Sequence, residues 1–513
     1  MKKGYISRDG KIFKRLPKNS KGDFAIPDGV EIIAKRAFAD CSDVTAISIP
    51  SSVREIGEEA FMCCSSLTSI ILPEGVDSIP TRTFSDCENL NSVSLPTTIK
   101  AIGKAAFEDC LKLTAVVIPE GVETIGGWAF GGCVKLLSII LPSSLKEIKE
   151  YAFNDCSSLK SIDIPEGVTV ISDSCFSYAG LEEVKLPNSL KEIGDKAFEC
   201  TNLKAIELGE NVERIGSFAF FHLSNDTITL TIGTRVSAIG YGAFKENHLK
   251  SITVDKENHT YTDGGCNVIM EIETGAVIYG SVCSSIPENA RRINWGAFFD
   301  APKMMSIPGS VETIESYAFT ACTGNTFILE EGIKTIKWRA FCGCEQGKIT
   351  VHLPESVEEI GGQLSSVEFH LDAGNTYFHY DSVGRNIISK DGELVWGRLL
   401  QGIPTEGVSK MSAIIDSNIG CAELCVPKNV SFIEHSTLNN STGIKRFVLT
   451  KGTKTLSGFF TFGTINCEIK LLVPIKTSDS GITMNYEYNI PKGTSLWDIN
   501  NFLGEDSFYD THR

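Results

Sequence analysis

Apolar residues recur along most of this chain with a period of about 23 residues. The period is clearest in phenylalanine, which is spaced by 23 and later by 22 or 24 residues at Phe38, Phe61, Phe84, Phe107, Phe130, Phe153, Phe176, Phe198, Phe220 and Phe244. The series resumes at Phe298, Phe319 and Phe341. With 28 phenylalanines in 513 residues, six successive chance matches would have a probability on the order of 10⁻⁸, so the period is an internal repeat.

Each repeat predicts two short extended stretches and a closing turn. The general pattern is C-x-x-L-x-x-I-x-L-P-x-x-V-x-x-I-G-x-x-A-F. In one repeat, Ile70 and Leu72 occupy alternate positions, as in a strand with one buried face. Pro73 ends this strand because it cannot donate to a backbone ladder. Val76 and Ile79 then form a second, shorter stretch before the phenylalanine.

A single 23-residue coil cannot bury its own apolar edge. Neighbouring coils must therefore stack, so that each apolar position becomes a continuous column. With strands about 4.8 Å apart, 13 such coils would form a stack roughly 60 Å long. The pattern predicts a solenoid.

Three segments depart from the repeat and predict β-hairpins. Residues 5–13 and 386–396 each place alternating apolar residues around an Asp-Gly pair, and residues 267–279 do so around Thr-Gly. Asp-Gly between alternating apolar runs is a strong hairpin signal. The predicted segments are an N-terminal hairpin or cap (1–25), a regular array (26–254), a hairpin insert (255–290), further repeats (291–370), a second hairpin insert (371–403), degenerate repeats (404–475) and a C-terminal cap (476–513).

Cysteine follows phenylalanine by three residues, or by two at one position. Nine of the 17 cysteines share this column: Cys41, Cys64, Cys87, Cys110, Cys133, Cys156, Cys200, Cys322 and Cys344. We interpret them as buried free thiols that act as small apolar side chains. Disulfides between stacked coils would have poor geometry because the Cβ vectors run parallel. Zinc sites need close pairs of ligands, which this column lacks. Both alternatives remain open.

Charge and hydropathy narrow the possible partners and compartment. The 64 acidic and 48 basic residues give a net charge of −16, which disfavours nucleic acid and anionic membranes. Every apolar run is far shorter than the roughly 20 residues that span a bilayer, so we expect no membrane insertion. Polar residues soon follow Lys2 and Lys3, and no signal peptide is visible. A cytoplasmic location is therefore one of the two locations that we consider.

The repeats LTSIILPEGVDSIPTRTFSDC and IPSSVREIGEEAFMCC resemble those of the BspA-like leucine-rich repeat family, found in bacterial and protist cell-surface proteins. The resemblance is strong over residues 26–353 and weak to about residue 472. It implies an α/β leucine-rich repeat solenoid, mainly β, in which coils of about 23 residues form a curved right-handed stack with inserted β-hairpins. It also implies adhesion or recognition at the cell surface or after secretion, without catalysis.

A search for chemistry finds no catalytic motif in the sequence. The eight histidines form no H-E-x-x-H pair, and neither a phosphate-binding loop nor a G-x-S-x-G elbow is present. We expect no enzyme activity, cofactor or metal. An enzyme with a site outside the repeats is the remaining alternative, and it depends on the poorly patterned residues after Leu472.

The outward positions of the strands are the candidate partner-binding surface. In leucine-rich repeat proteins the strands line the concave wall, and here the predicted contact residues are Ile71, Val117, Ile140, Asp163, Lys185 and Glu207. An exposed apolar stripe with polar neighbours often marks a protein contact. The strand propensity of Ile and Val explains the stripe equally well. The hypothesis is a recognition protein for a protein or glycan partner, and an intracellular protein-interaction scaffold is the alternative.

Overall fold

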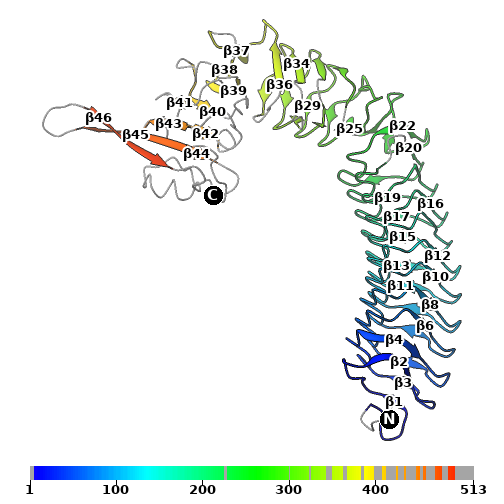
Figure 1. The fold of residues 1–513 in the computed structure, drawn as a ribbon. Coiled ribbons are helices and arrows are strands. Elements are labelled where there is room, and N and C mark those ends of the chain that lie inside the picture. The colour runs from blue at the N-terminus through cyan, green and yellow to red at the C-terminus, as the bar shows by residue number, and fades with distance from the viewer. Residues whose placement is uncertain are drawn as a thin grey trace. The chain divides into compact units, whose positions relative to one another are not determined.

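The computed structural model describes residues 5–411 except 225–227, 300, 323–324, 343–348, 362–366, 383–385 and 398–406, together with six later strands. The chain divides into two compact units, Met1–Glu273 and Thr274–Arg513, which are described separately. Every regular element in the described residues is a β-strand (Figure 1). The predicted mainly β leucine-rich repeat solenoid is confirmed, with turns at the positions where an α/β repeat would have helices.

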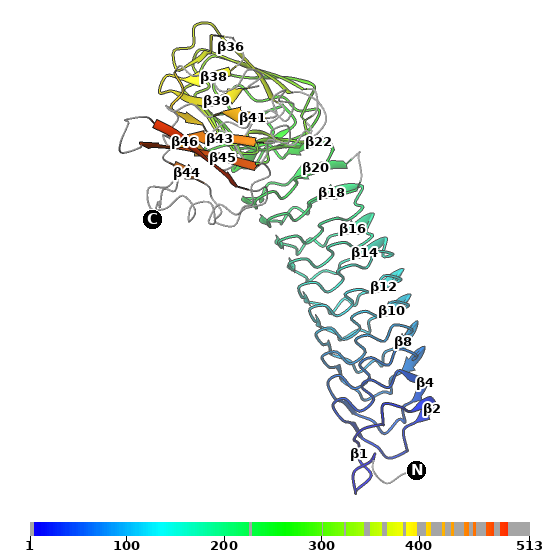
Figure 2. The ribbon, with the colours of Figure 1, turned by 60° about the vertical axis from the view of Figure 1, so that its left-hand side comes forward.

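The first strand of each coil in unit 1 joins a parallel array that we call the main sheet (Figure 2). In unit 1, only even-numbered strands belong to it. Their backbone pairing falls into four separate parts, which run from β2 to β4, from β6 to β12, from β14 to β16 and from β18 to β22. The strands are β2 (Lys21–Ala25), β4 (Asp43–Ser48), β6 (Ser69–Ile71), β8 (Ser92–Ser94), β10 (Ala115–Val117), β12 (Ser138–Ile140), β14 (Ser161–Asp163), β16 (Glu183–Lys185), β18 (Ala205–Glu207), β20 (Ile228–Ile232) and β22 (Leu249–Val254).

The second extended stretch of each coil pairs in the same way and forms a second ladder. Its strands are β1 (Ile12–Phe13), β3 (Ile32–Ile33), β5 (Glu55–Ile56), β7 (Ser78–Ile79), β9 (Ala101–Ile102), β11 (Thr124–Ile125), β13 (Glu147–Ile148), β15 (Val170–Ile171), β17 (Glu192–Ile193), β19 (Arg214–Ile215) and β21 (Ala238–Ile239). The odd-numbered strands from β7 to β21 form one eight-stranded parallel sheet. The pattern predicted this stretch from the valine and isoleucine after each proline.

The turn that carries phenylalanine closes each coil. Its backbone also bonds from coil to coil, for example from Phe84 N to Ala106 O at 2.8 Å. Residues two before and two after the phenylalanine adopt positive φ, as at Ala105 (54°) and Asp109 (56°). These left-handed residues let the chain turn without forming a helix while its amides remain paired with the next coil.

Phenylalanine rings stack along the interior of unit 1. Successive rings from Phe38 to Phe244 lie 5.1–5.7 Å apart and nearly parallel. The column begins one coil earlier than the spacing predicted, because Phe13 stacks on Phe38 at 4.8 Å. Phe13 precedes Phe38 by 25 residues, so a strict period of 23 misses it. Offset stacking adds to the burial of each ring.

The cysteine column lies beside these rings and has a polar role that the sequence does not reveal. The thiol of Cys110 donates a hydrogen bond to the carbonyl of Phe84 at 3.2 Å, and the same contact recurs at Cys64, Cys87, Cys133 and Cys156 with distances of 3.1–3.2 Å. Asn247 takes over this role, with Nδ2 donating to Phe220 O and Phe244 O at 2.6 and 2.7 Å. Each phenylalanine carbonyl that accepts a thiol also accepts the backbone amide of the cysteine in its own turn, so the thiol column adds a second hydrogen bond between coils as well as filling space.

Coils in unit 1 are joined in pairs by the turn after each strand. An acidic residue followed by glycine alternates with two hydroxyl or amide residues, as in Glu120-Gly121 followed by Ser143-Ser144. Glu120 accepts hydrogen bonds from the amide and hydroxyl of Ser143 at 3.1 and 3.0 Å. The hydroxyl of Ser144 accepts from Gly121 N and donates to Val122 O, both at 2.8 Å. Gly121 has a φ of 96°, which favours glycine.

The same pairing joins Glu74 to Thr97 and Glu166 to Asn188. In unit 2 it joins Glu331 to Glu355. Backbone amides donating to these carboxylates lower the pKa of Glu120 and Glu166. The polar contacts of these turns therefore repeat every two coils, twice the length of the sequence period.

Unit 2 continues the same arrangement. The main-sheet strands are β28 (Met304–Ile307), β31 (Thr326–Leu329), β34 (Ile349–Leu353) and β36 (Val367–Leu371). The second ladder contains β25 (Ala276–Gly280), β26 (Arg292–Ile293), β29 (Thr313–Ile314), β32 (Thr335–Ile336) and β35 (Glu359–Ile360), and the phenylalanine turns form β27 (Phe298–Phe299), β30 (Phe319–Thr320) and β33 (Phe341–Cys342). Rings of Phe298, Phe319 and Phe341 stack at 5.1 Å.

Later strands extend unit 2 beyond the phenylalanine repeats. They are β37 (Phe378–Tyr380), β38 (Asn386–Ser389), β39 (Glu393–Gly397), β40 (Lys410–Met411), β41 (Glu423–Cys425), β42 (Phe432–Glu434), β43 (Arg446–Thr450), β44 (Thr455–Ser457), β45 (Glu468–Lys476) and β46 (Thr483–Ile490). Strands β39, β40, β42 and β44 pair in parallel. Strands β45 and β46 pair antiparallel.

The three predicted hairpin segments contain strands or bridges. An antiparallel bridge joins Ile6 and Phe13, and β38 pairs antiparallel with β39. Strands β24 (Val268–Glu271) and β25 lie on either side of the Thr-Gly turn, and β24 pairs antiparallel with β23 (Tyr261–Thr262). The segment boundaries remain predictions. Cys344, much of the degenerate repeats and the end of the C-terminal cap lie outside the described residues.

Alkylation of the native protein should separate buried from exposed thiols. Desolvation raises the pKa of Cys41 to about 12 and raises the pKa of Cys110 and Cys133 in the same direction. Thiolate is the reactive form, so these sites should resist iodoacetamide, whereas exposed Cys283 should react. Mass spectrometry of native and denatured protein measures the difference. Disulfide-linked peptides from the column would contradict the free-thiol interpretation.

Deletion of two coils should harm unit 1 less than deletion of one. Removing residues 73–118 keeps the alternation of turns, whereas removing residues 96–118 leaves Glu74-Gly75 beside Glu120-Gly121 and without the threonine partners. Because these groups are exposed or only partly buried, each lost hydrogen bond should cost no more than about 1 kcal/mol. Urea and thermal unfolding followed by circular dichroism provide the comparison. A one-coil deletion as stable as the two-coil deletion would argue against the paired repeat.

Candidate functional site on the main sheet of unit 1

The outward side chains of the main sheet form columns that run from coil to coil. Alternation in each short strand buries the central residue and exposes the residues on both sides, as in β6 and β12. Parallel pairing keeps equivalent positions aligned, with Ser69 opposite Ser92 and Val117 opposite Ile140. A column of outward residues is therefore a continuous surface.

One column carries the three apolar residues predicted from the sequence. Ile71, Val117 and Ile140 are 71%, 62% and 60% exposed. Leu137, just before β12, is 63% exposed and was missed by the sequence analysis. The sequence did contain a signal for it. The equivalent position in the three preceding coils is polar, with Thr68, Asn91 and Thr114, so leucine at this position indicates an exposed apolar side chain. We call Ile71, Val117, Leu137 and Ile140 the apolar patch.

Small side chains occupy the column that begins each strand. These exposed residues are Ser69, Ser92, Ala115, Ser138 and Ser161. They leave the sheet backbone accessible beside the larger side chains of the apolar patch. A partner can therefore contact the patch from the side as well as from above, which suits a broad and shallow interface better than an enclosed small-molecule site.

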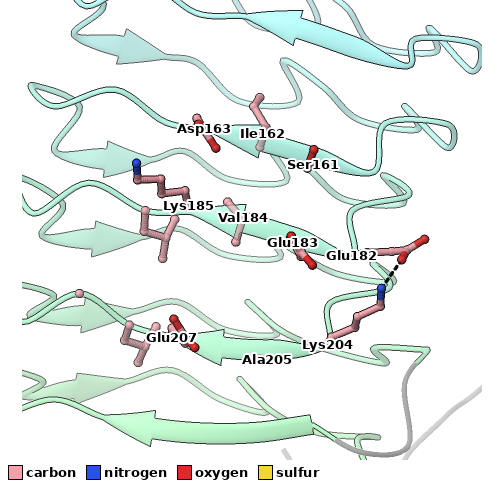
Figure 3. A pocket seen from close by; sticks show the side chains of 13 residues that line it. Ser161, Ile162, Asp163, Glu182, Glu183, Val184, Lys185, Lys204, Ala205 and Glu207 are labelled. Carbon is pink, nitrogen blue, oxygen red and sulfur yellow. Dashed lines mark hydrogen bonds and ion pairs between the residues drawn. The ribbon is translucent and has the colours of Figure 1, made fainter.

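The other three predicted residues line a hollow of about 730 Å³ on the same sheet. Asp163, Lys185 and Glu207 come from β14, β16 and β18, and Figure 3 shows their side chains on three successive coils. Asp163 is the register partner of Lys185. Strand β16 is not paired with β18, although backbone hydrogen bonds join the two coils just before these strands. The hollow lies at this interruption. We call it the charged hollow.

Ion pairs line one side of the charged hollow. Glu182 accepts from Lys204 Nζ at 2.5 Å and from Lys160 Nζ at 3.3 Å (Figure 3 shows the Lys204 contact). The hydrogen bond from Lys204 lowers the pKa of Glu182, and the same bond raises the pKa of Lys204. These three groups are largely engaged with one another. Because Glu182, Lys160 and Lys204 are at least partly exposed to solvent, their ion pairs contribute little to stability.

The remaining charged groups of the hollow have no ion-pair partner in the described part of the protein. They are Asp163, Glu183, Lys185 and Glu207, all exposed. Three carboxylates and one ammonium group are therefore available to a partner. The six predicted residues thus form two adjoining surfaces instead of one stripe, an apolar patch over β6–β12 and a charged hollow over β14–β18.

The lining of the charged hollow includes four carboxylates and two ammonium groups. It contains neither histidine nor cysteine. In the described residues, no group of three or more His, Cys, Asp or Glu side chains could hold a metal ion. No helix long and apolar enough to cross a bilayer occurs in the same residues.

Comparison with solved structures supports the fold. A leucine-rich repeat protein from Bacteroides ovatus is 27% identical, with a TM-score of 0.54, over 72% of this chain and 97% of that one. The Treponema pallidum leucine-rich repeat protein is 30% identical over 37% of this chain and 81% of that one, with a TM-score of 0.28. A leucine-rich cell surface protein from Faecalibacterium prausnitzii is 19% identical over 89% and 93% of the two chains, with a TM-score of 0.31.

The family assignment depends on the repeats themselves. No curated protein matches the chain. The family model described as the BspA type leucine-rich repeat region matches residues 11–137, 123–250 and 282–372, in six copies. These ranges cover more than half of the 513 residues, and they contain both the apolar patch and the charged hollow. The chain therefore belongs to the BspA-type leucine-rich repeat family.

Proposed function

We propose that this chain is a non-enzymatic recognition protein that binds a protein or glycan partner through the main sheet of unit 1. The observation that carries the proposal is the apolar patch, in which four large apolar side chains on one face are each at least 60% exposed. Ser94 lies between Ile71 and Val117 in their column. Water contact with the four apolar side chains is unfavourable, and their burial by a partner would contribute roughly 25 cal/mol per Å² of apolar surface covered.

The charged hollow supports the same proposal. A few apolar anchors supply most of the affinity of an interface, while charged groups beside them select the partner and its orientation. Here the anchors and the charged groups occupy successive coils of one rigid stack. A partner that covers both would contact strands β6 to β18, a length of sheet typical of an interface with a macromolecule.

Substitution of the apolar patch tests the binding face. In Ile71→Ser/Val117→Ser/Ile140→Ser the sheet should be retained, because all three side chains point to solvent. Binding to a panel of immobilised matrix proteins and glycans should fall at least about tenfold, the effect of losing about 1.4 kcal/mol. Surface plasmon resonance on each ligand that the unmodified chain binds measures the change.

A matched control replaces exposed apolar residues by serine outside the apolar patch. Leu111 and Val170 are 37% and 39% exposed and lie outside the outward columns of the main sheet. Leu111→Ser/Val170→Ser should leave binding unchanged. Equal binding by the patch variant and the unmodified chain would place the contact on another face, and equal loss in both variants would indicate a general effect on folding.

We further propose that the protein acts at the cell surface, in adhesion. The support is its membership of the BspA-type family, together with a binding face suited to a macromolecule. The alternative is an intracellular interaction scaffold, which the column of reduced, buried thiols would also suit.

Protease treatment of intact cells distinguishes these locations. A surface protein should lose its full-length band when intact cells are exposed to proteinase K, whereas an internal protein should be cut only after lysis. Immunoblotting with a cytoplasmic marker as control provides the measurement. Full protection in intact cells would exclude the surface proposal and leave the recognition proposal to be judged by the binding experiment.

A further inference from the structure

Two histidines occupy one outward column of the main sheet of unit 2. His352 lies on β34 and His370 on β36, and the two are register partners on adjacent parallel strands. Their rings are stacked with centroids 5.0 Å apart and planes 20° apart. The sheet spacing of about 4.8 Å holds the two backbones at nearly the same separation as the rings.

Both imidazoles are exposed, and packing does not explain their position. The alternating burial of β34 places Val351 and Leu353 in the interior and His352 in solvent, and β36 likewise buries Phe369 beside exposed His370. In the described residues neither ring makes a hydrogen bond or an ion pair. The ring nitrogens are therefore available to a ligand from outside the chain.

Paired imidazoles in this arrangement suit a divalent late transition metal. Neutral imidazole is a common ligand for Zn²⁺, Cu²⁺ and Ni²⁺, with metal–nitrogen distances near 2.0–2.1 Å for zinc. Two nitrogens on one metal lie closer together than these rings do, so the rings must tilt toward each other. Exposed histidine side chains can make that movement by rotation about χ1 and χ2 without disturbing the ladder beneath them.

The surroundings of the pair also favour a cation. The net charge of −16 favours cations over anions around the molecule as a whole. On the open side of β36, the hydroxyl of Tyr380 bonds to Leu371 N and Phe369 O, the backbone groups on either side of His370. This contact fixes the strand edge at His370 and limits the movement of its backbone.

We propose that His352 and His370 form a two-imidazole site for a divalent late transition metal, Zn²⁺, Cu²⁺ or Ni²⁺. Water completes the coordination in the isolated protein. The open positions face solvent on the main sheet, so that a donor group of a bound partner replaces a water. The site is independent of the apolar patch, which belongs to unit 1.

Copper serves as the probe because its ligands can be counted. Electron paramagnetic resonance of the full-length chain with one equivalent of Cu²⁺ should show coupling to imidazole nitrogens, and calorimetry with Zn²⁺ should give one site. The variants His352→Gln and His370→Gln keep side chains of similar size on the sheet. Each should weaken the metal affinity at least about tenfold, the lower end of the effect of removing even an outer-shell partner.

An exposed histidine without a histidine neighbour in register provides the control. His259→Gln, in unit 1, should leave the copper spectrum and the zinc isotherm unchanged. Circular dichroism should be the same for all variants, because none of the substituted rings is buried. An unchanged spectrum and affinity in His352→Gln/His370→Gln would overturn the proposal, as would the absence of zinc binding at millimolar concentration.

Discussion

A coil of 23 residues can bury its phenylalanine only against the coils on either side, and the rest of the repeat depends on that stacking. The rings of unit 1 lie 5.1–5.7 Å apart from Phe38 to Phe244, which is close to the spacing of strands in a sheet. The backbone hydrogen bonds of the main sheet, the second ladder and the phenylalanine turn can therefore form at the same coil-to-coil distance that the stacked rings require. Burial and backbone pairing specify the same separation, so neither is strained to satisfy the other.

The polar contacts inside this stack join each coil to the next. The carbonyl of Phe84 accepts from Cys87 N within its own turn and from Cys110 Sγ of the following coil, and the same two contacts recur along the column. Cysteine supplies this second hydrogen bond with a thiol that is also small and apolar enough to pack, and Nδ2 of Asn247 donates to Phe220 O in the same position. At the surface, the turns with an acidic residue and glycine form hydrogen bonds with the hydroxyl turns of the next coil, and these bonds join the coils in pairs.

Stacking also explains why this fold can present a binding surface. Once the inward columns fix the position of each strand, the outward residues are free to vary without affecting the core. Unit 1 uses this freedom to place apolar side chains over β6–β12 and charged ones over β14–β18. In unit 2 the same outward positions bring His352 and His370 together. The same repeat can therefore carry different chemistries in its outward positions.

The sequence by itself determined the repeat, its two extended stretches and the exposure of Ile71, Val117 and Ile140, because these follow from local alternation and a fixed period. It did not determine the thiol-to-carbonyl contacts, the pairing of coils or the start of the ring column at Phe13. Those depend on which atoms of neighbouring coils meet. The tertiary structure also decided that Asp163, Lys185 and Glu207 line a hollow, which lies where β16 and β18 are not paired. Periodicity specifies which residues share a column, whereas the distances between columns arise only when the coils stack.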